Sequence, residues 1–177
     1  VRQPDLQIVR IDRPVKDDPS IVDVVLTGDP EAPPKKDESL PPVRAAGPVK
    51  AGQPMLLVRL LSRDGKADDK PPARIDELTE KRNAIRRLVL PADAVAPGYK
   101  VLLYAYKEGD ALPKTAWNDR RDRVTIEWPG QVDTVAFAPA PCGKTNLAVT
   151  RVGDGAAQEL VRIGKDTPSL PGPPADV

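Results

Sequence analysis

Short apolar runs, each closed by proline or glycine, recur along the chain. In its first part they fall at residues 6–9, 21–26 and 55–61, and most of their residues are β-branched or leucine. Such runs are typical of strands, because a helix needs a longer window free of proline. We therefore expect three strands there. The stretch 29–53 is rich in proline and charge, and it predicts an exposed loop or linker.

The stretch 75–90 is ambiguous. Ile75, Leu78, Ile85 and Leu88 partly fit the spacing of a helix face, whereas residues 85–90 fit a strand. We expect a loop or a short helical turn that leads into a strand.

A period of two is clearest at residues 99–107, where tyrosines and aliphatic residues alternate over the whole window. Alternate residues of a strand point to opposite faces of its sheet. One face is formed by Leu102, Tyr104 and Tyr106, and the other by Val101, Leu103 and Ala105. Because both faces are apolar, we expect a strand that is covered on both sides.

Further strands are expected in the last third of the chain. Residues 123–128 alternate between an inward set, Val124, Ile126 and Trp128, and an outward set, Arg123, Thr125 and Glu127. Pro129 and Gly130 then form a turn into a second strand at 131–138, so we expect an antiparallel pair with Trp128 and Phe137 in the core. Two more strands, one with Leu147 and Val149 and one at 160–163, flank Gly153 and Gly155.

Together these elements predict an all-β fold, an antiparallel β-sandwich with proline-rich loops. Residues 54–164 form the sandwich domain in this interpretation. Residues 1–53 are a proline-rich segment with two short strands that can belong to the same sandwich, and residues 165–177 are a proline-rich tail, extended or disordered.

Composition narrows the possible chemistry. The 177 residues include no histidine and a single cysteine, Cys142, so neither a Ser-His-Asp nor a Cys-His site can be built, and no disulfide can form within the chain. The net charge of +1 gives no support for a nucleic-acid partner. No apolar run approaches the ~20 residues of a membrane-spanning helix.

Two motifs that carry chemistry elsewhere are better explained as turns. Residues 138–145, APAPCGKT, end like a phosphate-binding loop, but prolines remove amide donors and Gly153 follows too soon for the required helix. The pairs Asp17-Asp18 and Asp68-Asp69 lie among prolines and lysines, which favours solvated loops over a metal site. We expect no catalytic residue, no metal and no cofactor.

The best candidates for ligand contact are aromatic and arginine residues. Trp117 precedes a loop with alternating charges, and an aromatic ring beside arginine forks can hold an anionic sugar. Tyr104 and Tyr106, two positions apart on one strand, can form a stacking surface for a sugar ring. The alternatives stay open: the arginines and Trp117 also fit a charged hairpin tip, and the two tyrosines also fit a core face. The candidate glycan-binding residues are Trp117, Arg120, Arg121, Arg123, Tyr104 and Tyr106.

Two segments carry a family resemblance. KVLLYAYKEGDALPKTAWN, at 100–118, followed by RVTIEWPGQVDTVAF, at 123–137, resembles the downstream β-sandwich of heparinase II/III-type polysaccharide lyases, and the similarity of strand and turn order extends over residues 54–163. Members of that family cleave acidic polysaccharides by β-elimination with Tyr, His and Asn residues. This chain has no histidine and no long helical region, so the resemblance implies an accessory module and transfers no catalytic residue.

The resemblance sets the functional expectation. It implies a non-catalytic module of a secreted or periplasmic lyase-like protein, which supports a catalytic partner domain or contacts an acidic polysaccharide. The alternative is a structural or interaction domain of a bacterial envelope protein with no carbohydrate role.

Overall fold

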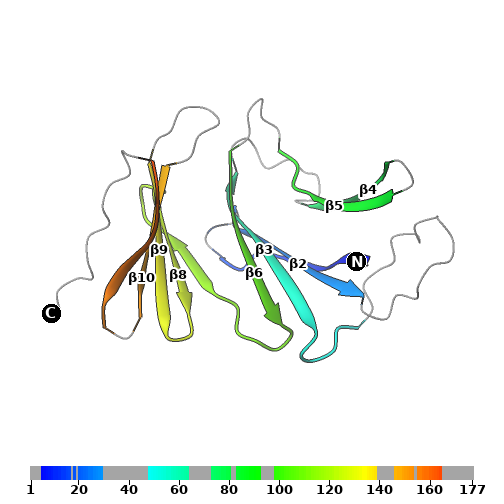
Figure 1. Cartoon of the computed structure of the whole chain (residues 1–177), viewed down its shortest axis with the longest axis horizontal. Helices are drawn as coiled ribbons and strands as arrows, with labels where there is room; N and C mark the ends of the chain where they lie inside the picture. Colours follow the sequence, from blue (N-terminus) through cyan, green and yellow to red (C-terminus); the bar gives the residue numbers. More distant parts are fainter. Residues whose placement is uncertain are drawn as a thin grey trace. The chain divides into compact units, whose positions relative to one another are not determined.

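A computed structural model describes residues 5–16, 18, 20–29, 48–63, 73–80, 83–92, 98–138, 146–153 and 155–164. These residues form eleven strands and no helix, and every strand pair is antiparallel (Figure 1). The prediction of an all-β, antiparallel β-sandwich is confirmed. The chain divides into two compact units, residues 1–110 and 111–177.

The first unit contains a four-stranded sheet and a hairpin. The sheet has the order β1-β2-β3-β6, so the two strands of residues 1–53 lie in the same sheet as β3. The unit therefore continues across residue 53, where the sequence suggested a boundary. Its strands are β1 (Asp5–Asp12), β2 (Val22–Asp29), β3 (Pro54–Arg63), β4 (Arg74–Glu80), β5 (Asn83–Val89) and β6 (Tyr99–Lys107).

The hairpin β4–β5 covers one face of this sheet. Alternation on β2 and β3 directs Val24 and Val58 to that face, where they are 1% and 3% exposed. Ile75 of β4 and Leu88 of β5 pack against the same cluster. Burial of such aliphatic side chains stabilises the two layers by about 1.5–3 kcal/mol per residue.

Residues 74–80 correct the prediction made for that stretch. They form the strand β4 and pair with β5, from Arg74↔Val89 to Glu80↔Asn83, in place of a loop or helical turn. The partial helix spacing misled because Ile75 and Leu88 are cross-strand partners that share one face of a hairpin.

The prediction that β6 is covered on both sides is wrong. β6 is an edge strand, and its second face leaves Val101 37% and Leu103 66% exposed. Leu103 is the cross-strand partner of Val58 on β3, which is buried on the same face of the sheet. The covered part of that face therefore ends between β3 and β6. Sequence alternation reports what could be covered, whereas the position of a strand in its sheet decides what is covered.

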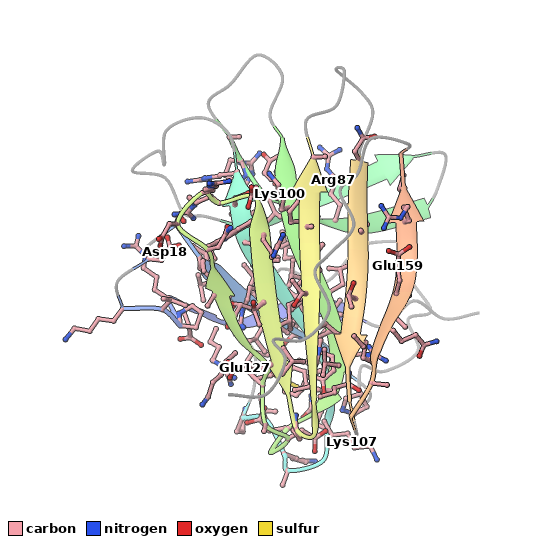
Figure 2. All side chains as sticks on the ribbon, turned by 90° about the vertical axis from the view of Figure 1, so that its left-hand side faces the viewer. Asp18, Arg87, Lys100, Lys107, Glu127 and Glu159 are labelled. Carbon is pink, nitrogen blue, oxygen red and sulfur yellow. The ribbon has the colours of Figure 1, made fainter. Side chains whose placement is uncertain are left out.

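The second unit is a five-stranded meander with the order β11-β10-β9-β8-β7. The predicted inward residues Val124 and Ile126 are 0% and 5% exposed, and Trp128 and Phe137 are half-buried. Glu127 and Glu159 project from this sheet in Figure 2. Its strands are β7 (Lys114–Trp117), β8 (Arg123–Trp128), β9 (Gln131–Ala138), β10 (Asn146–Val152) and β11 (Ala157–Ile163).

Three register shifts interrupt the regular pairing. One lies in β1 between Ile8 and Arg10, one in β3 at Leu61 and one in β11 at Leu160. β1 and β11 are edge strands, and a bulge in an edge strand makes it a poor template for a further strand. The edge strand β6, in contrast, pairs through all nine of its residues.

Several sequence predictions lie outside the described residues. They are residues 30–47 of the predicted loop, Asp17 of the pair Asp17-Asp18, the pair Asp68-Asp69, residues 139–145 with Cys142, and the tail 165–177.

Candidate functional site

Trp117 and Arg121 come together at the loop between β7 and β8. Trp117 ends β7, and its ring centroid lies 5.8 Å from that of Phe137 on β9. The guanidinium carbon of Arg121 lies 5.7 Å from the centroid of the Trp117 ring, within the range of a cation–π contact. The loop therefore places a cation against an aromatic ring, and glycan contact by these residues stays a prediction.

Asn118 fixes the shape of this loop. Its side-chain oxygen accepts hydrogen bonds from the backbone N–H groups of Asp122 at 3.2 Å and Arg123 at 3.1 Å. Its side-chain nitrogen donates to the carboxylate of Asp122 at 2.7 Å, and its carbonyl accepts from the N–H of Arg121 at 2.9 Å. Four contacts from one residue hold the tip as a defined turn.

Arg121 adopts a left-handed backbone conformation, with φ of 53°. It is the only non-glycine residue with positive φ among those whose backbone is described. That conformation costs an L-residue roughly 1–2 kcal/mol relative to glycine. The loop thus carries arginine at a position where glycine is the less strained choice.

The other predicted loop arginines take different positions. Arg120 is exposed at the tip. Arg123 pairs with Ala136 while Trp117 pairs with Val124, so Arg123 lies on the opposite face of the sheet from Trp117. The structure therefore brings Trp117 and Arg121 together and separates Arg123 from them.

Tyr104 and Tyr106 belong to β6, in the first unit. Their rings stack with centroids 5.9 Å apart and planes inclined by 6°. Tyr106 is 7% exposed, and burial, with a smaller contribution from Glu108, raises its pKa against the opposing effect of Arg10. Because a raised pKa keeps the phenol protonated at neutral pH, Tyr106 is not prepared to act as a base.

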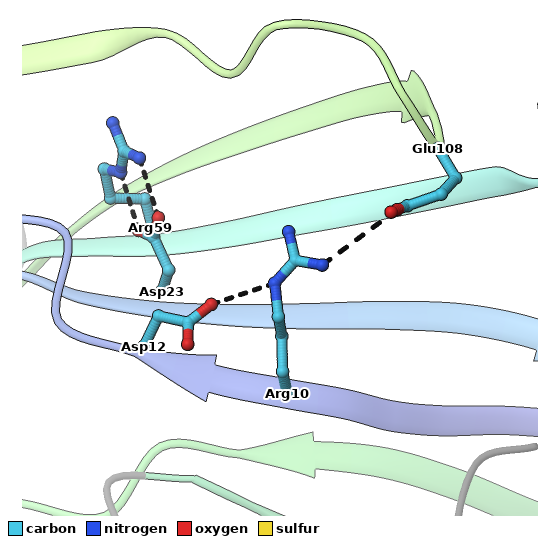
Figure 3. A network of polar contacts seen from close by, with 5 residues as sticks. All are labelled: Arg10, Asp12, Asp23, Arg59 and Glu108. Carbon is cyan, nitrogen blue, oxygen red and sulfur yellow. Dashed lines mark hydrogen bonds and ion pairs between the residues drawn. The ribbon is translucent and has the colours of Figure 1, made fainter. Parts of the chain in front are cut away.

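A polar group that includes Arg10, Asp12 and Glu108 lies on one face of the first unit (Figure 3), and Arg10 and Glu108 both influence the pKa of Tyr106. Arg10 donates to Asp12 at 2.9 Å and lies 4.0 Å from Glu108. The hydroxyl of Tyr106 and one carboxylate oxygen of Glu108 are buried without a hydrogen-bond partner among the described residues.

The same face holds a buried ion pair, Asp23 on β2 with Arg59 on β3. Two hydrogen bonds of 2.6 and 2.7 Å join the guanidinium and the carboxylate. The side chains of Asp23 and Arg59 are 4% and 3% exposed. The two residues are direct cross-strand partners, which accounts for the two-point geometry.

The sequence analysis missed a second arginine–carboxylate centre, in the second unit. Asp133 on β9 accepts hydrogen bonds from Arg151 on β10 at 2.7 and 2.9 Å and from the indole N–H of Trp128 at 2.9 Å. These donors, Arg151 foremost, lower the pKa of Asp133 despite its burial, and the same bond raises the pKa of Arg151. One sequence signal was available: Asp133 has the same strand parity as the apolar Val135 and Phe137, and it pairs with the buried Ile126 on that face.

A small hollow lies beside this centre, at the turn between β10 and β11. Its volume is about 230 Å³, and it is lined by Arg151, Gly153, Ala156 and Gln158. Arg151 and Gln158 are cross-strand partners, so their side chains leave the sheet on the same face.

The described residues contain neither a metal-binding cluster nor a membrane-spanning helix. They contain no group of three or more His, Cys, Asp or Glu side chains placed to hold a metal ion. They also contain no helix of the length and apolarity needed to cross a membrane.

Comparison of the chain with protein-family models, with curated proteins and with solved structures gave no match. The resemblance to heparinase II/III-type lyases therefore stays a prediction.

Proposed function

We propose that this chain is a non-catalytic β-sandwich module that contacts an acidic polysaccharide through the β7–β8 loop. In this proposal it serves a secreted or periplasmic lyase-like protein, next to a domain that performs the chemistry. The observation that carries the proposal is Arg121, held in a strained conformation over Trp117.

Strain at a single loop residue supports a role in binding. Glycine at position 121 would make the same turn without the cost, and the four contacts of Asn118 hold the turn whatever the side chain at 121. Residues kept in unfavourable conformations cluster at ligand contacts. The arginine is then retained for its guanidinium, which offers a carboxylate or sulfate group paired hydrogen bonds.

The described side chains offer little for catalysis. β-Elimination needs a base of suitable pKa and a group that neutralises the enolate. Burial raises the pKa of Tyr106, which moves this phenol away from base function, and the chain has no histidine. These features support a binding role over a catalytic one.

The test is calorimetric titration of the whole chain with heparan-type and alginate-type polymers and with neutral dextran. We expect binding of the acidic polymers only, weakened by salt because the contact is between exposed charges. Arg121→Gly is expected to lower affinity about tenfold or more, since hydrogen bonds to charged groups contribute ~1.5–3 kcal/mol. The same substitution should leave the melting temperature unchanged or raise it, because the backbone strain is relieved.

Arg87→Ala is the matched control. Arg87 is an exposed arginine of β5, in the first unit, with a 3.7 Å ion pair to Asp76, so its substitution makes the same change in net charge outside the β7–β8 loop. Equal loss of affinity in the two variants would reduce the contact to overall charge and contradict the proposal. Release of an unsaturated uronate by the unmodified chain would overturn the non-catalytic part.

A structural role without carbohydrate binding is the second candidate function. The exposed Val101 and Leu103 on the regular edge strand β6 favour it, because apolar edges are interaction sites. This function predicts no glycan binding by the unmodified chain and identical behaviour of Arg120→Ala/Arg121→Ala.

A further inference from the structure

We propose that the hollow at the β10–β11 turn is a binding site for a small organic carboxylate, with Arg151 as its principal contact. This site is separate from the β7–β8 loop and does not depend on glycan binding there. Nothing in the sequence motifs pointed to it.

Arg151 has donors left over in a suitable arrangement. A guanidinium carries five N–H donors in a planar fork. Asp133 takes two of them, one from Nε and one from Nη2. The side-chain oxygen of Gln131 lies 3.2 Å from the same two nitrogens, Nε and Nη2, on the side that faces Asp133. The remaining three donors belong to Nη1 and to the side of Nη2 turned toward Nη1, and one from each nitrogen forms a second fork that matches the two oxygens of a carboxylate.

Asp133 also fixes the orientation of this second fork. The carboxylate of Asp133 is itself held by the Trp128 indole, and its side chain is 8% exposed. Arg151, by contrast, is 41% exposed. The guanidinium is therefore anchored on its buried side and accessible on its outer side, so that little conformational entropy is lost when an anion binds.

The hollow suits one small polar group. Its volume of about 230 Å³ is below the ~300–1,000 Å³ of sites for drug-sized ligands. Gln158, the cross-strand partner of Arg151, is exposed beside it and can donate from its amide nitrogen to the same carboxylate. A carboxylate on a short carbon skeleton, such as a sugar acid or hydroxy acid, meets both the size and the donor arrangement.

Gly153 offers a position at the lining of the hollow where a larger side chain meets no close neighbour. A Cβ atom built on Gly153 meets no atom within 4 Å, and its φ lies outside the left-handed region. Gly153→Leu therefore inserts a side chain into open space at the lining. Gly155, with φ of +108°, offers no such substitution.

The experiment titrates the whole chain with glucuronate, acetate, glucose and inorganic sulfate, and follows amide chemical shifts by NMR. We expect glucuronate and acetate to shift Gln158 and the residues around Arg151, glucose to shift neither, and sulfate to bind at least threefold more weakly than acetate. Gly153→Leu should weaken glucuronate binding about tenfold or more at an unchanged melting temperature. Arg162→Gln is the control, because Arg162 also pairs with a carboxylate, that of Glu159, but does not line the hollow.

Three results would overturn the proposal. The first is the absence of shifts around Arg151 with any carboxylate up to high millimolar concentration. The second is equal binding of sulfate and acetate, which would show a response to charge alone. The third is unchanged binding in Gly153→Leu, with folding verified by the dispersion of its amide signals.

Discussion

At the residue scale, the feature with the largest energetic consequence is the buried pair Asp23–Arg59. Removing two charges from water costs several kcal/mol each, and only a close, well-aligned contact offsets that cost. The pair has such geometry, at 2.6 and 2.7 Å between adjacent strands. It is therefore sensitive to the loss of either partner and far less sensitive to the loss of both.

Asp23→Ala or Arg59→Ala alone is expected to destabilise the chain by ~3–5 kcal/mol, since each leaves a buried charge without its partner. The double variant Asp23→Val/Arg59→Met should recover most of that loss, because apolar residues of similar volume avoid the desolvation cost. Urea denaturation of the four proteins measures the coupling. Additive losses in the double variant would contradict this account.

Asp133 predicts a specific response to acid. Its folded-state pKa lies below that of the unfolded chain, ~3.9, so the carboxylate contributes stability that is fully present above that value and is lost as pH falls through the folded-state pKa. Asp133→Asn removes the titration. The difference in unfolding free energy between the two proteins should therefore be largest at pH 5–7 and shrink below about pH 4. A constant difference down to pH 2 would count against the Arg151 bond.

Sequence could not identify this centre at the residue scale. Arg151 lies 18 positions from Asp133, and only the β9–β10 register makes them partners. Trp117 and Arg121 lie four positions apart in one loop, so their proximity could be predicted. The separation of Arg123 from Trp117 could not, because it depends on the β7–β8 register that pairs Trp117 with Val124.

At the scale of elements, the position of a strand in its sheet decides how exposed its side chains are, even where the residues look alike in sequence. Leu57 of β3 is 0% exposed and Leu103 of β6 is 66% exposed, although both stand in leucine-rich runs of a strand. β3 is an inner strand and β6 an edge strand, and Leu57, whose partner on β6 is Tyr104, lies on the opposite face of the sheet from Leu103.

The substitution of each leucine by alanine tests this difference. Leu57→Ala should cost ~2–5 kcal/mol, the range for deleting a buried aliphatic side chain. Leu103→Ala should stay within ~0.5 kcal/mol, as for other surface positions. Thermal or urea unfolding of the matched pair measures both, and a similar cost at the two sites would mean that Leu103 is buried in solution.

Strands with strong alternation were predictable, and strands defined by pairing were not. The runs at 55–61, 99–107 and 123–128 carried enough alternation or apolar content to be recognised. β7, with only four residues, has no period to detect, and β4 acquires its strand form from its partner β5.

At the scale of the whole molecule, the absence of histidine shapes the response to pH. Histidine is the side chain whose ordinary pKa lies between pH 5 and 8. Hydrogen bonds from neighbouring arginines lower the pKa of Asp76, Asp133 and Glu159, so these carboxylates titrate in acid.

The unfolding free energy should therefore form a plateau, changing by less than ~0.5 kcal/mol between pH 6 and 7.5. Chemical denaturation at four pH values across that interval measures it. A slope equivalent to one bound proton, ~1.4 kcal/mol per pH unit, would reveal a titrating group that the pattern of charges does not suggest.

The irregular outer strands have a further consequence for assembly. β1 contains a bulge whereas β6 has none of its own, so the four-stranded sheet has one boundary that resists annealing and one that permits it. Copies that joined edge to edge through β6 would consume the only compatible boundary of that sheet. Growth through this sheet alone would therefore terminate at a pair.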